Sequence, residues 1–296
     1  MISDDELAGL DEFALLDENA EQAGVTTVPP VRRIDVGPIS GLKFGEPSPR
    51  VVFLHGGGQN AHTFDTVILG LGEPALALDL PGHGRSAWRE DGDYGPTRNA
   101  ATIEPVVREL APDAELVVGM SLGGLTAIRL AVTAPDLVRR LVLIDVTPTS
   151  PARHQEMTEE QKGTVALVSG PRTFGSFAEM LDVTIAAAPH RDRKSLRRGV
   201  FHNARRLEDG SWTWRYDTLR TGDGFDGLWD DVPRLTVPTT LIRGARSAFV
   251  DDADADEFAR TAPGFDGVRL VADSGHSVQS DQPRVLVELL RGVLRS

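Results

Sequence analysis

Short runs of apolar residues recur along the chain, and each run ends at residues that favour turns. Such runs, without polar alternation, are typical of strands buried on both faces of a parallel sheet. We therefore predict buried strands at residues 51–54, 75–80, 115–118, 141–144, 239–242 and 268–271.

The segments between these runs carry the spacing of amphipathic helices. Leu122, Leu125, Ile128 and Val132 recur every three or four residues before Pro135, so they share one face of a helix. Alternation of buried strands with helices predicts an α/β fold with a doubly wound, mostly parallel central sheet.

One interval interrupts this alternation. Between Thr147 and about Asp231 there is no clear buried strand, and the interval holds prolines, helical stretches and three of the four tryptophans. We interpret residues 149–232 as an inserted, largely helical cap. The α/β core then comprises residues 31–148 and 233–296.

Residues 1–30 look like an extension of the core. Leu7, Leu10, Phe13 and Leu16 recur every three residues among acidic side chains, which predicts one apolar stripe on a short helix docked on the domain. The proline pair at 29–30 should end that helix.

Composition narrows the class of protein. The chain has 296 residues, 40% of them apolar, which is ample for a sizeable core and excludes intrinsic disorder. It has no cysteine, which excludes disulfides, thiolate metal sites and a cysteine nucleophile.

Charge and hydropathy bear on partners and location. Acidic residues outnumber basic ones by 44 to 31, giving a net charge of −13, which disfavours nucleic acid and anionic membrane surfaces as partners. No apolar run approaches the roughly 18 residues of a transmembrane helix, and the acidic N-terminus does not resemble a signal peptide. We expect a cytoplasmic protein; its oligomeric state stays open.

A candidate nucleophile follows the third predicted strand. Residues 119–123, GMSLG, fit the pattern G-x-S-x-G between a strand and an amphipathic helix, as a nucleophile elbow requires. The tight turn needs small residues at Gly119 and Gly123, and Gly124 lets the helix pack closely on the sheet. Ser121 then lies at the helix N-terminus, where backbone N–H groups converge. The alternative is a glycine-rich turn with a serine cap.

A candidate base follows the last predicted strand. A serine hydroxyl needs a base whose pKa lies near neutral pH, and histidine provides one. His276, in the segment SGHS, lies 20 residues before the end of the chain. We predict that His276 takes the proton of Ser121.

The glycine-rich segment His55-Gly56-Gly57-Gly58 follows the first predicted strand. Glycines let backbone N–H groups approach a reacting carbonyl and hold an oxyanion. We predict that the N–H groups of Gly57 and Leu122 do this, and that His55 holds the loop by hydrogen bonds rather than acting as the base.

These motifs occur in a familiar order. The segments HGGGQNAHTFD, LDLPGHGRSAW, GMSLGG, LVLIDVTP, LIRGARS and DSGHSVQSDQP resemble the α/β-hydrolase fold superfamily, in particular bacterial serine hydrolases with an HGGGQ loop. The resemblance covers residues 31–148 and 233–296. It implies the α/β-hydrolase fold, a Ser–His–acid triad, no metal and no organic cofactor.

The chain departs from that family at the acid. Similar proteins usually carry an aspartate directly after Ser247, where this chain has Ala248. The candidates for the acid are Asp145 at the end of the fourth predicted strand, or Asp251 and Asp252 just downstream of Ala248. We favour Asp145, because a buried strand end holds a side chain more firmly than an acidic loop does. An aspartate is also common at that position when it serves only to cap a loop.

The cap offers two further features. Residues 190–206 contain seven lysines and arginines and one acid, which we interpret as a solvated helix rather than a site for anionic substrate. Several aromatic residues could line an acyl pocket, although each alone is more typical of a core: Trp88, Phe174, Phe177, Trp212, Trp214, Tyr216 and Trp229.

We therefore predict a serine hydrolase acting on a small, mostly apolar ester or lactone through an acyl-enzyme on Ser121. The same arrangement also supports C–C bond hydrolysis, perhydrolysis and lyase chemistry. A non-catalytic ligand-binding protein, with Ala248 marking a decayed triad, is the alternative from another class. The presence of both Ser121 and His276 argues against it.

Overall fold

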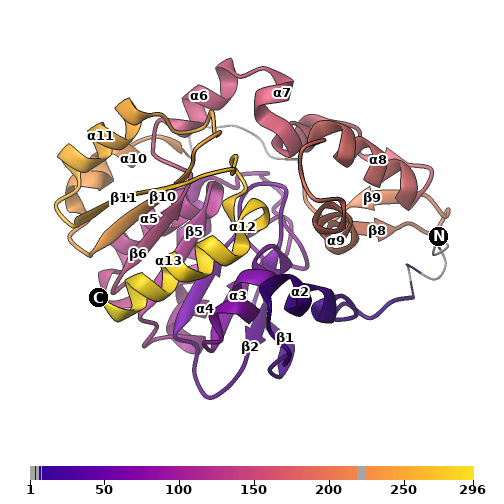
Figure 1. The fold of residues 1–296 in the computed structure, drawn as a ribbon, viewed down its shortest axis with the longest axis horizontal. Helices are drawn as coiled ribbons and strands as arrows, with labels where there is room; N and C mark the ends of the chain where they lie inside the picture. The colour runs from indigo at the N-terminus through magenta and orange to yellow at the C-terminus, as the bar shows by residue number, and fades with distance from the viewer. Residues whose placement is uncertain (1–3, 5–6, 8, 219–224) are drawn as a thin grey trace.

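The computed structural model describes residues 4, 7, 9–218 and 225–296 (Figure 1). An eight-stranded sheet forms its centre, with strand order β1-β2-β4-β3-β5-β6-β10-β11, antiparallel from β1 to β4 and parallel from there on. The strands are β1 (Val31–Val36), β2 (Ile39–Phe44), β3 (Val51–Leu54), β4 (Ala75–Leu78), β5 (Leu116–Met120), β6 (Leu141–Ile144), β10 (Thr239–Gly244) and β11 (Phe265–Val271).

The predicted mostly parallel α/β fold is thus confirmed, and each of the six predicted strands is present. Sequence analysis missed the hairpin of β1 and β2. In β1 only Ile34 is buried, and β1 carries Arg32, Arg33 and Asp35, so it lacks the apolar run that marks the central strands.

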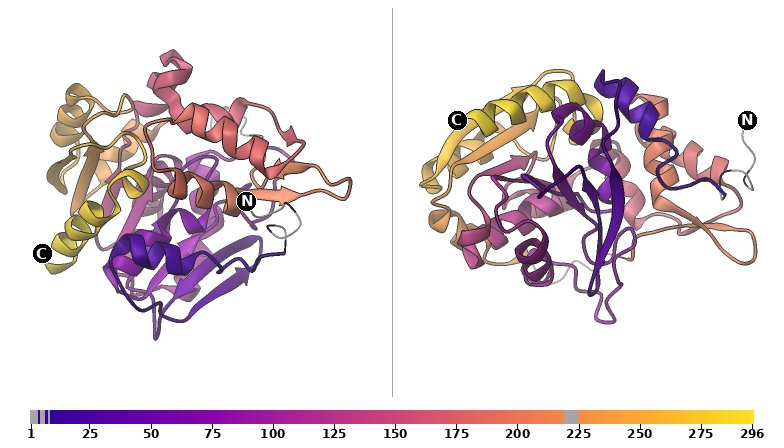
Figure 2. Two further views of the ribbon diagram at one scale, coloured as in Figure 1. Left: turned by 45° about the vertical axis from the view of Figure 1, so that its right-hand side comes forward. Right: turned by 90° about the horizontal axis from the view of Figure 1, so that it is seen from below.

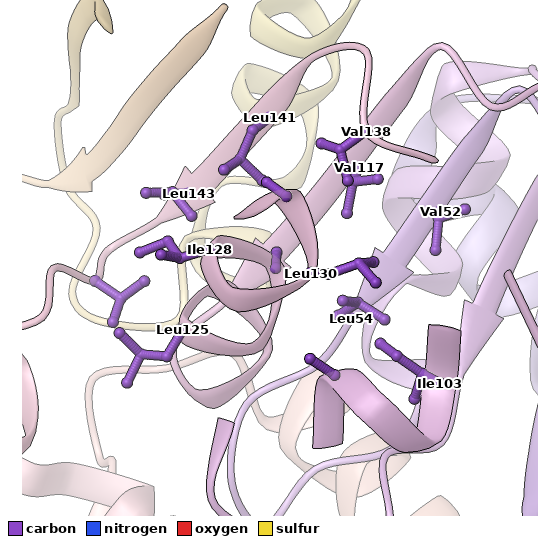
Figure 3. Close-up of a cluster of buried hydrophobic side chains, with 14 of the residues drawn as sticks. Val52, Leu54, Ile103, Val117, Leu125, Ile128, Leu130, Val138, Leu141 and Leu143 are labelled. Carbon is purple, nitrogen blue, oxygen red and sulfur yellow. The ribbon is translucent and has the colours of Figure 1, made fainter. Parts of the chain in front are cut away.

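Helices cover both faces of the sheet. One face packs against α3 (Asp65–Leu71) and α13 (Pro283–Arg295), and the other against α4 (Pro96–Leu110), α5 (Leu122–Thr133) and α11 (Asp252–Thr261). Figure 3 shows the second interface, where α5 presents Leu125, Ile128 and Leu130 beside the strand residues Val117 and Leu143. At roughly 25 cal/mol per Å² of apolar surface, these buried leucines and isoleucines contribute about 1.5–3 kcal/mol each.

Residues 150–214, between β6 and β10, lie to one side of the sheet (Figures 1 and 2), whereas residues 228–231 pack against α5. The helical elements of this interval are α6 (Ser150–Glu156), α7 (Glu159–Lys162), η3 (Gly163–Ser169), α8 (Phe177–Ala187), α9 (Arg193–Asn203), α10 (Leu228–Asp231) and η5 (Val232–Arg234). We call residues 149–218 the cap.

The interval also contains three short strands that the sequence did not reveal. Strands β7 (Thr173–Phe174), β8 (Ala204–Arg206) and β9 (Trp212–Trp214) form a small antiparallel sheet in the order β7-β9-β8. Strands of two or three residues are too short to show a periodicity in the sequence. This sheet and α8 enclose the cap's own apolar cluster.

The N-terminal stripe also differs from the prediction. Helix α2 begins only at Leu16 and ends at Ala23, where Gly24 adopts a left-handed conformation. Leu7 is buried in the apolar cluster of the cap, whereas Leu10 is 37% exposed. The carboxylate of Asp11 accepts a hydrogen bond from the N–H of Phe13, which favours a turn rather than a continuous helix.

Among the described residues, no helix combines the length and the apolar composition needed to cross a membrane.

Candidate active site

Ser121 occupies a strained turn between β5 and α5. Its φ of 49° and ψ of −119° lie outside the regions that a residue with a side chain prefers, at a cost of about 1–3 kcal/mol. A Cβ on Gly123 would lie 2.1 Å from the carbonyl oxygen of Leu54, so only glycine fits this close crossing of β3. The turn places the backbone of Ser121 directly before the first free N–H groups of α5.

His276 lies on the loop after β11, and Asp145 lies at the end of β6. The structure brings them together across 131 residues, with His276 Nδ1 2.7 Å from Asp145 Oδ2. Because the carboxylate accepts, Nδ1 carries the proton and Nε2 keeps its lone pair. His276 Nε2 is buried and has no hydrogen-bond partner in the described part of the chain, Ser121 included. Such contacts are often formed only once substrate is bound.

Asp145 is fully buried and has a φ of 52°. Its Oδ1 accepts the backbone N–H of Gly244 at 3.1 Å, and its Oδ2 accepts the hydroxyl of Ser247. A Cβ on Gly244 would meet the carbonyl oxygen of Gly275 at 2.1 Å, so glycine allows the His276 loop to lie against the end of β10. These contacts orient the carboxylate toward the imidazole.

The other two candidate acids make different contacts. Asp251 caps α11 by accepting the N–H of Asp254 at 2.9 Å, and it pairs with Arg153 at 2.8 Å. That backbone hydrogen bond is the main reason why the pKa of Asp251 is lowered. Asp252 is exposed and pairs with Arg243 at 2.7 Å. Of the three, only Asp145 contacts His276.

Two contributors to this arrangement were not predicted. Ser247 donates to Asp145 and accepts the N–H of Phe249 at 3.1 Å. The ring of Phe249 stacks on the imidazole of His276, with centroids 3.6 Å apart and planes inclined by 12°. Ser247 lies in the segment LIRGARS, which could have marked it, whereas nothing in the local sequence marks Phe249.

The glycine-rich loop is held by buried histidines. His55 Nδ1 donates to the carbonyl of Gly56 at 2.8 Å, and its Nε2 accepts the N–H of Leu80 at 2.9 Å. Both ring nitrogens of His55 are therefore occupied by backbone groups. Burial lowers its pKa to about 4, so the ring is neutral at pH 7. This agrees with the interpretation of His55 as a loop-holding residue.

His83 and Asn203 complete the support of this loop. His83 Nε2 accepts the N–H of Gly58 at 3.1 Å, and burial lowers its pKa to about 3. From the cap, Asn203 Nδ2 donates to the carbonyl of Gly58 at 3.0 Å, and Asn203 Oδ1 accepts from Asn60 at 2.7 Å. The loop that carries Gly57 is thus held by the core and by α9 together.

A cavity of about 120 Å³ lies between this loop and the cap. Gly57 and Gly58 border it from the core, and Gln279 of α12 (Val278–Asp281) borders it beside the loop that carries His276. Apolar side chains of η3 and α9 contribute to its wall, among them Val165, Val168 and Leu196. Ser121 and His276 lie outside its lining, so it is a space next to the reacting groups.

The aromatic residues between Thr147 and Asp231 have separate roles. Trp214 and Tyr216 line the cavity. Trp212 packs in the cap's own cluster and donates from Nε1 to Asp4 at 3.0 Å, while Trp229 packs against the core near Phe258. Among the described residues, Trp212 and Trp229 are therefore not part of this cavity's wall.

The interpretation of residues 190–206 as a solvated helix was wrong in part. Arg198 is 6% exposed, and its guanidinium donates to Gln22 of α2, while the neighbouring Arg197 pairs with Glu18. Arg191 is half-buried and lies 3.0 Å from Asp281. The sequence shows the charges of this segment but not their partners in space. It therefore did not reveal that acidic residues outside the cap pair with these arginines.

One cluster has the residue types of a metal site. Ligand atoms of His62, Asp65 and His202 lie within 4.8 Å of one another. The rings of His62 and His202 stack with centroids 3.7 Å apart, and His62 Nδ1 lies 2.8 Å from Asp65 Oδ2. Burial lowers the pKa of both histidines, so both imidazoles are in the neutral form that binds metals. As it stands, the cluster joins α9 to the core.

Comparison with known proteins bears on this geometry. The sequence model of the alpha/beta hydrolase family matches residues 51–289. The chain belongs to this family. It is 68% identical over 295 residues, 99% of each chain, to esterase Rv0045c of Mycobacterium tuberculosis. A solved structure of that esterase superposes with a TM-score of 0.90, covering 97% of this chain and 100% of that one.

A more distant relative has a different name. The 2-(acetamidomethylene)succinate hydrolase of Mesorhizobium japonicum is 26% identical over 266 residues, which cover 88% of this chain and 93% of that protein.

Proposed function

We propose that the protein is a serine esterase that cleaves a small, mostly apolar ester through an acyl-enzyme. The observation that carries this proposal is the hydrogen-bonded pair of His276 and Asp145, which leaves His276 Nε2 buried and free, together with a strained serine at a helix N-terminus. The 68% identity to a protein named an esterase supports it.

In this mechanism Ser121 attacks the ester carbonyl, and His276 Nε2 takes its proton. The N–H groups of Gly57 and Leu122 stabilise the oxyanion, and His276 then protonates the departing alcohol. Asp145 keeps the proton of the imidazole on Nδ1 and stabilises the imidazolium. Water, activated by His276, cleaves the acyl-enzyme.

The cap belongs to this proposal as the element that limits substrate size. Its contacts with the Gly57 loop through Asn203 place α9 beside the reacting groups. A cavity of about 120 Å³ has room for several water molecules, so it accommodates a short acyl group.

A fluorophosphonate probe tests the nucleophile. The wild-type protein should be labelled, and peptide mass spectrometry should place the adduct on Ser121. Ser121→Ala should abolish labelling and lower the hydrolysis of p-nitrophenyl acetate by about 10⁴-fold or more, with an unchanged circular dichroism spectrum. Labelling at another residue, or an alanine variant with the wild-type rate, would refute the assignment.

A further inference from the structure

We propose that Gln279 forms a polar subsite that binds an oxygen atom on the acyl group of the substrate. This deepens the proposed function, on which it rests. It assigns the substrate class as a short ester whose acyl chain carries an uncharged carbonyl or similar oxygen.

The first observation is the state of the Gln279 side chain. Gln279 is 1% exposed, and neither its Nε2 nor its Oε1 has a hydrogen-bond partner in the described part of the protein. A buried amide without partners destabilises the fold, so most such groups in folded proteins are hydrogen-bonded. An apolar residue of the same size at position 279 would not lower the stability of the fold in this way.

The second observation is where this amide lies. Gln279 borders the cavity between the cap and the loop that carries Gly57, and it follows His276 by only three residues. An ester carbonyl held by the N–H of Gly57 therefore has this cavity beside it. The acyl group stays attached to Ser121 until water cleaves it, so the acyl side needs the enclosed space.

The charges around the cavity indicate the kind of group it takes. The guanidinium of Arg191, which also lines the cavity, lies 3.0 Å from the carboxylate of Asp281. Arg191 and Asp281 offset each other. Arg198, the other guanidinium of the lining, lies 3.6 Å from the carboxylate of Glu18. Both cations therefore already face an acidic partner rather than an anionic acyl group. The apolar wall includes Val165, Val168 and Leu196. An uncharged acceptor on a short hydrocarbon chain suits both the wall and the Nε2 donor of Gln279.

Size restricts the group further. A cavity needs at least about 10–15 Å³ to hold one water molecule, so one of about 120 Å³ has room for several non-hydrogen atoms. The levulinyl group (4-oxopentanoyl) has five beyond its ester carbonyl, one of them the ketone oxygen. The 4-methylpentanoyl group has the same shape, with a methyl group in place of that oxygen.

The test compares the p-nitrophenyl esters of these two acids in kcat/KM. Gln279→Met keeps the length of the side chain and removes both polar atoms. We expect the ratio of levulinate to 4-methylpentanoate to fall by about tenfold to a hundredfold, through loss of levulinate turnover. Intrinsic differences in ester reactivity cancel, because the ratio is compared between proteins. Gln155→Met, at an exposed position in the cap, is the matched control and should leave the ratio unchanged.

Gln279→Glu provides a second, independent measurement if the methionine variant folds poorly. An ionised glutamate accepts hydrogen bonds but donates none, so it should lose levulinate turnover as the methionine variant does. A ratio that stays within about twofold of wild type in either folded variant would overturn the proposal, since a purely structural glutamine changes both esters in parallel. Failure of the esterase mechanism would look different, because Ser121→Ala would then still hydrolyse both esters.

Discussion

Replacing Asp145 by asparagine should convert the imidazole of His276 into a form that cannot act as a base. In the wild type, Asp145 Oδ1 accepts the fixed N–H of Gly244, and Oδ2 accepts from His276 Nδ1 at 2.7 Å. An asparagine must place its NH₂ group at one of these two positions. The backbone N–H of Gly244 cannot rotate or become an acceptor, so it selects the amide oxygen for its own side.

The NH₂ group then faces His276 Nδ1, which must accept a hydrogen bond from it. The proton of the neutral imidazole therefore moves from Nδ1 to Nε2. The lone pair that takes the proton of Ser121 is lost in this tautomer. Mutations of this kind in known triads lower kcat by about 10⁴, and we expect a loss of 10²–10⁴, equivalent to about 3–5.5 kcal/mol of transition-state stabilisation. The side chain keeps its volume, so packing around the fully buried position is little changed.

The assay is the steady-state hydrolysis of p-nitrophenyl butyrate at pH 8, with the melting temperature as a check on folding. Asp251→Asn is the matched control: it also removes one carboxylate charge, asparagine can still cap α11, and kcat should stay within about twofold of wild type. A large loss at Asp251 with none at Asp145 would refute the reasoning. Small losses at both would indicate a Ser–His dyad, and Ala248→Asp should then raise kcat.

Two further outcomes follow from the structure. Trp214→Ala should change the order of preference among esters of different chain length, because Trp214 lines the cavity. Trp229→Ala should keep that order and lower the free energy of unfolding by about 3 kcal/mol, because Trp229 packs against the core. A p-nitrophenyl ester series and urea unfolding measure the two effects. The reverse pattern would contradict the cavity's role. The free energy of unfolding should also fall as the pH decreases below about 6.5, because buried histidines with lowered pKa values bind protons only when unfolded; Asp65, whose pKa burial raises to about 7, opposes this in part. The buried histidines concerned are His55, His62, His83 and His202. The midpoints of urea unfolding at pH 7 and pH 5 test this prediction, and equal midpoints would contradict it.

The sheet could be predicted because its central strands are buried on both faces and read as unbroken apolar runs. The hairpin of β1 and β2 could not, since β1 is partly exposed and β2, although buried, is interrupted by Ser40, Gly41 and Lys43. The strands of the cap are too short to show a period. Trp212 shows the same limit: an aromatic residue in a cap suits a pocket or a core equally well until its neighbours are known.

For the candidate site, Ser121 and His276 stand in local motifs, so their positions could be read from the chain alone. The choice among Asp145, Asp251 and Asp252 could not be made this way, because it depends on which carboxylate reaches an imidazole far away in the sequence. Gln279 was not recognised for a related reason. Whether an amide is hydrogen-bonded depends on its neighbours in space, so the glutamine that follows SGHSV gives no indication of it in the sequence.

Helix α2 affects how far the cap can move. It packs on α3, its Gln22 carbonyl accepts from Arg284 of α13, and its Glu18 and Gln22 side chains bind the arginines of α9. A cap joined to the core only where the chain enters and leaves it could rotate as a rigid body about those two connections. The contacts between α2 and α9 add a third attachment, which restricts that rotation to a small sliding motion. A protein shortened at its N-terminus should therefore have a looser, faster-exchanging cap, even though every residue of the reacting centre is still present.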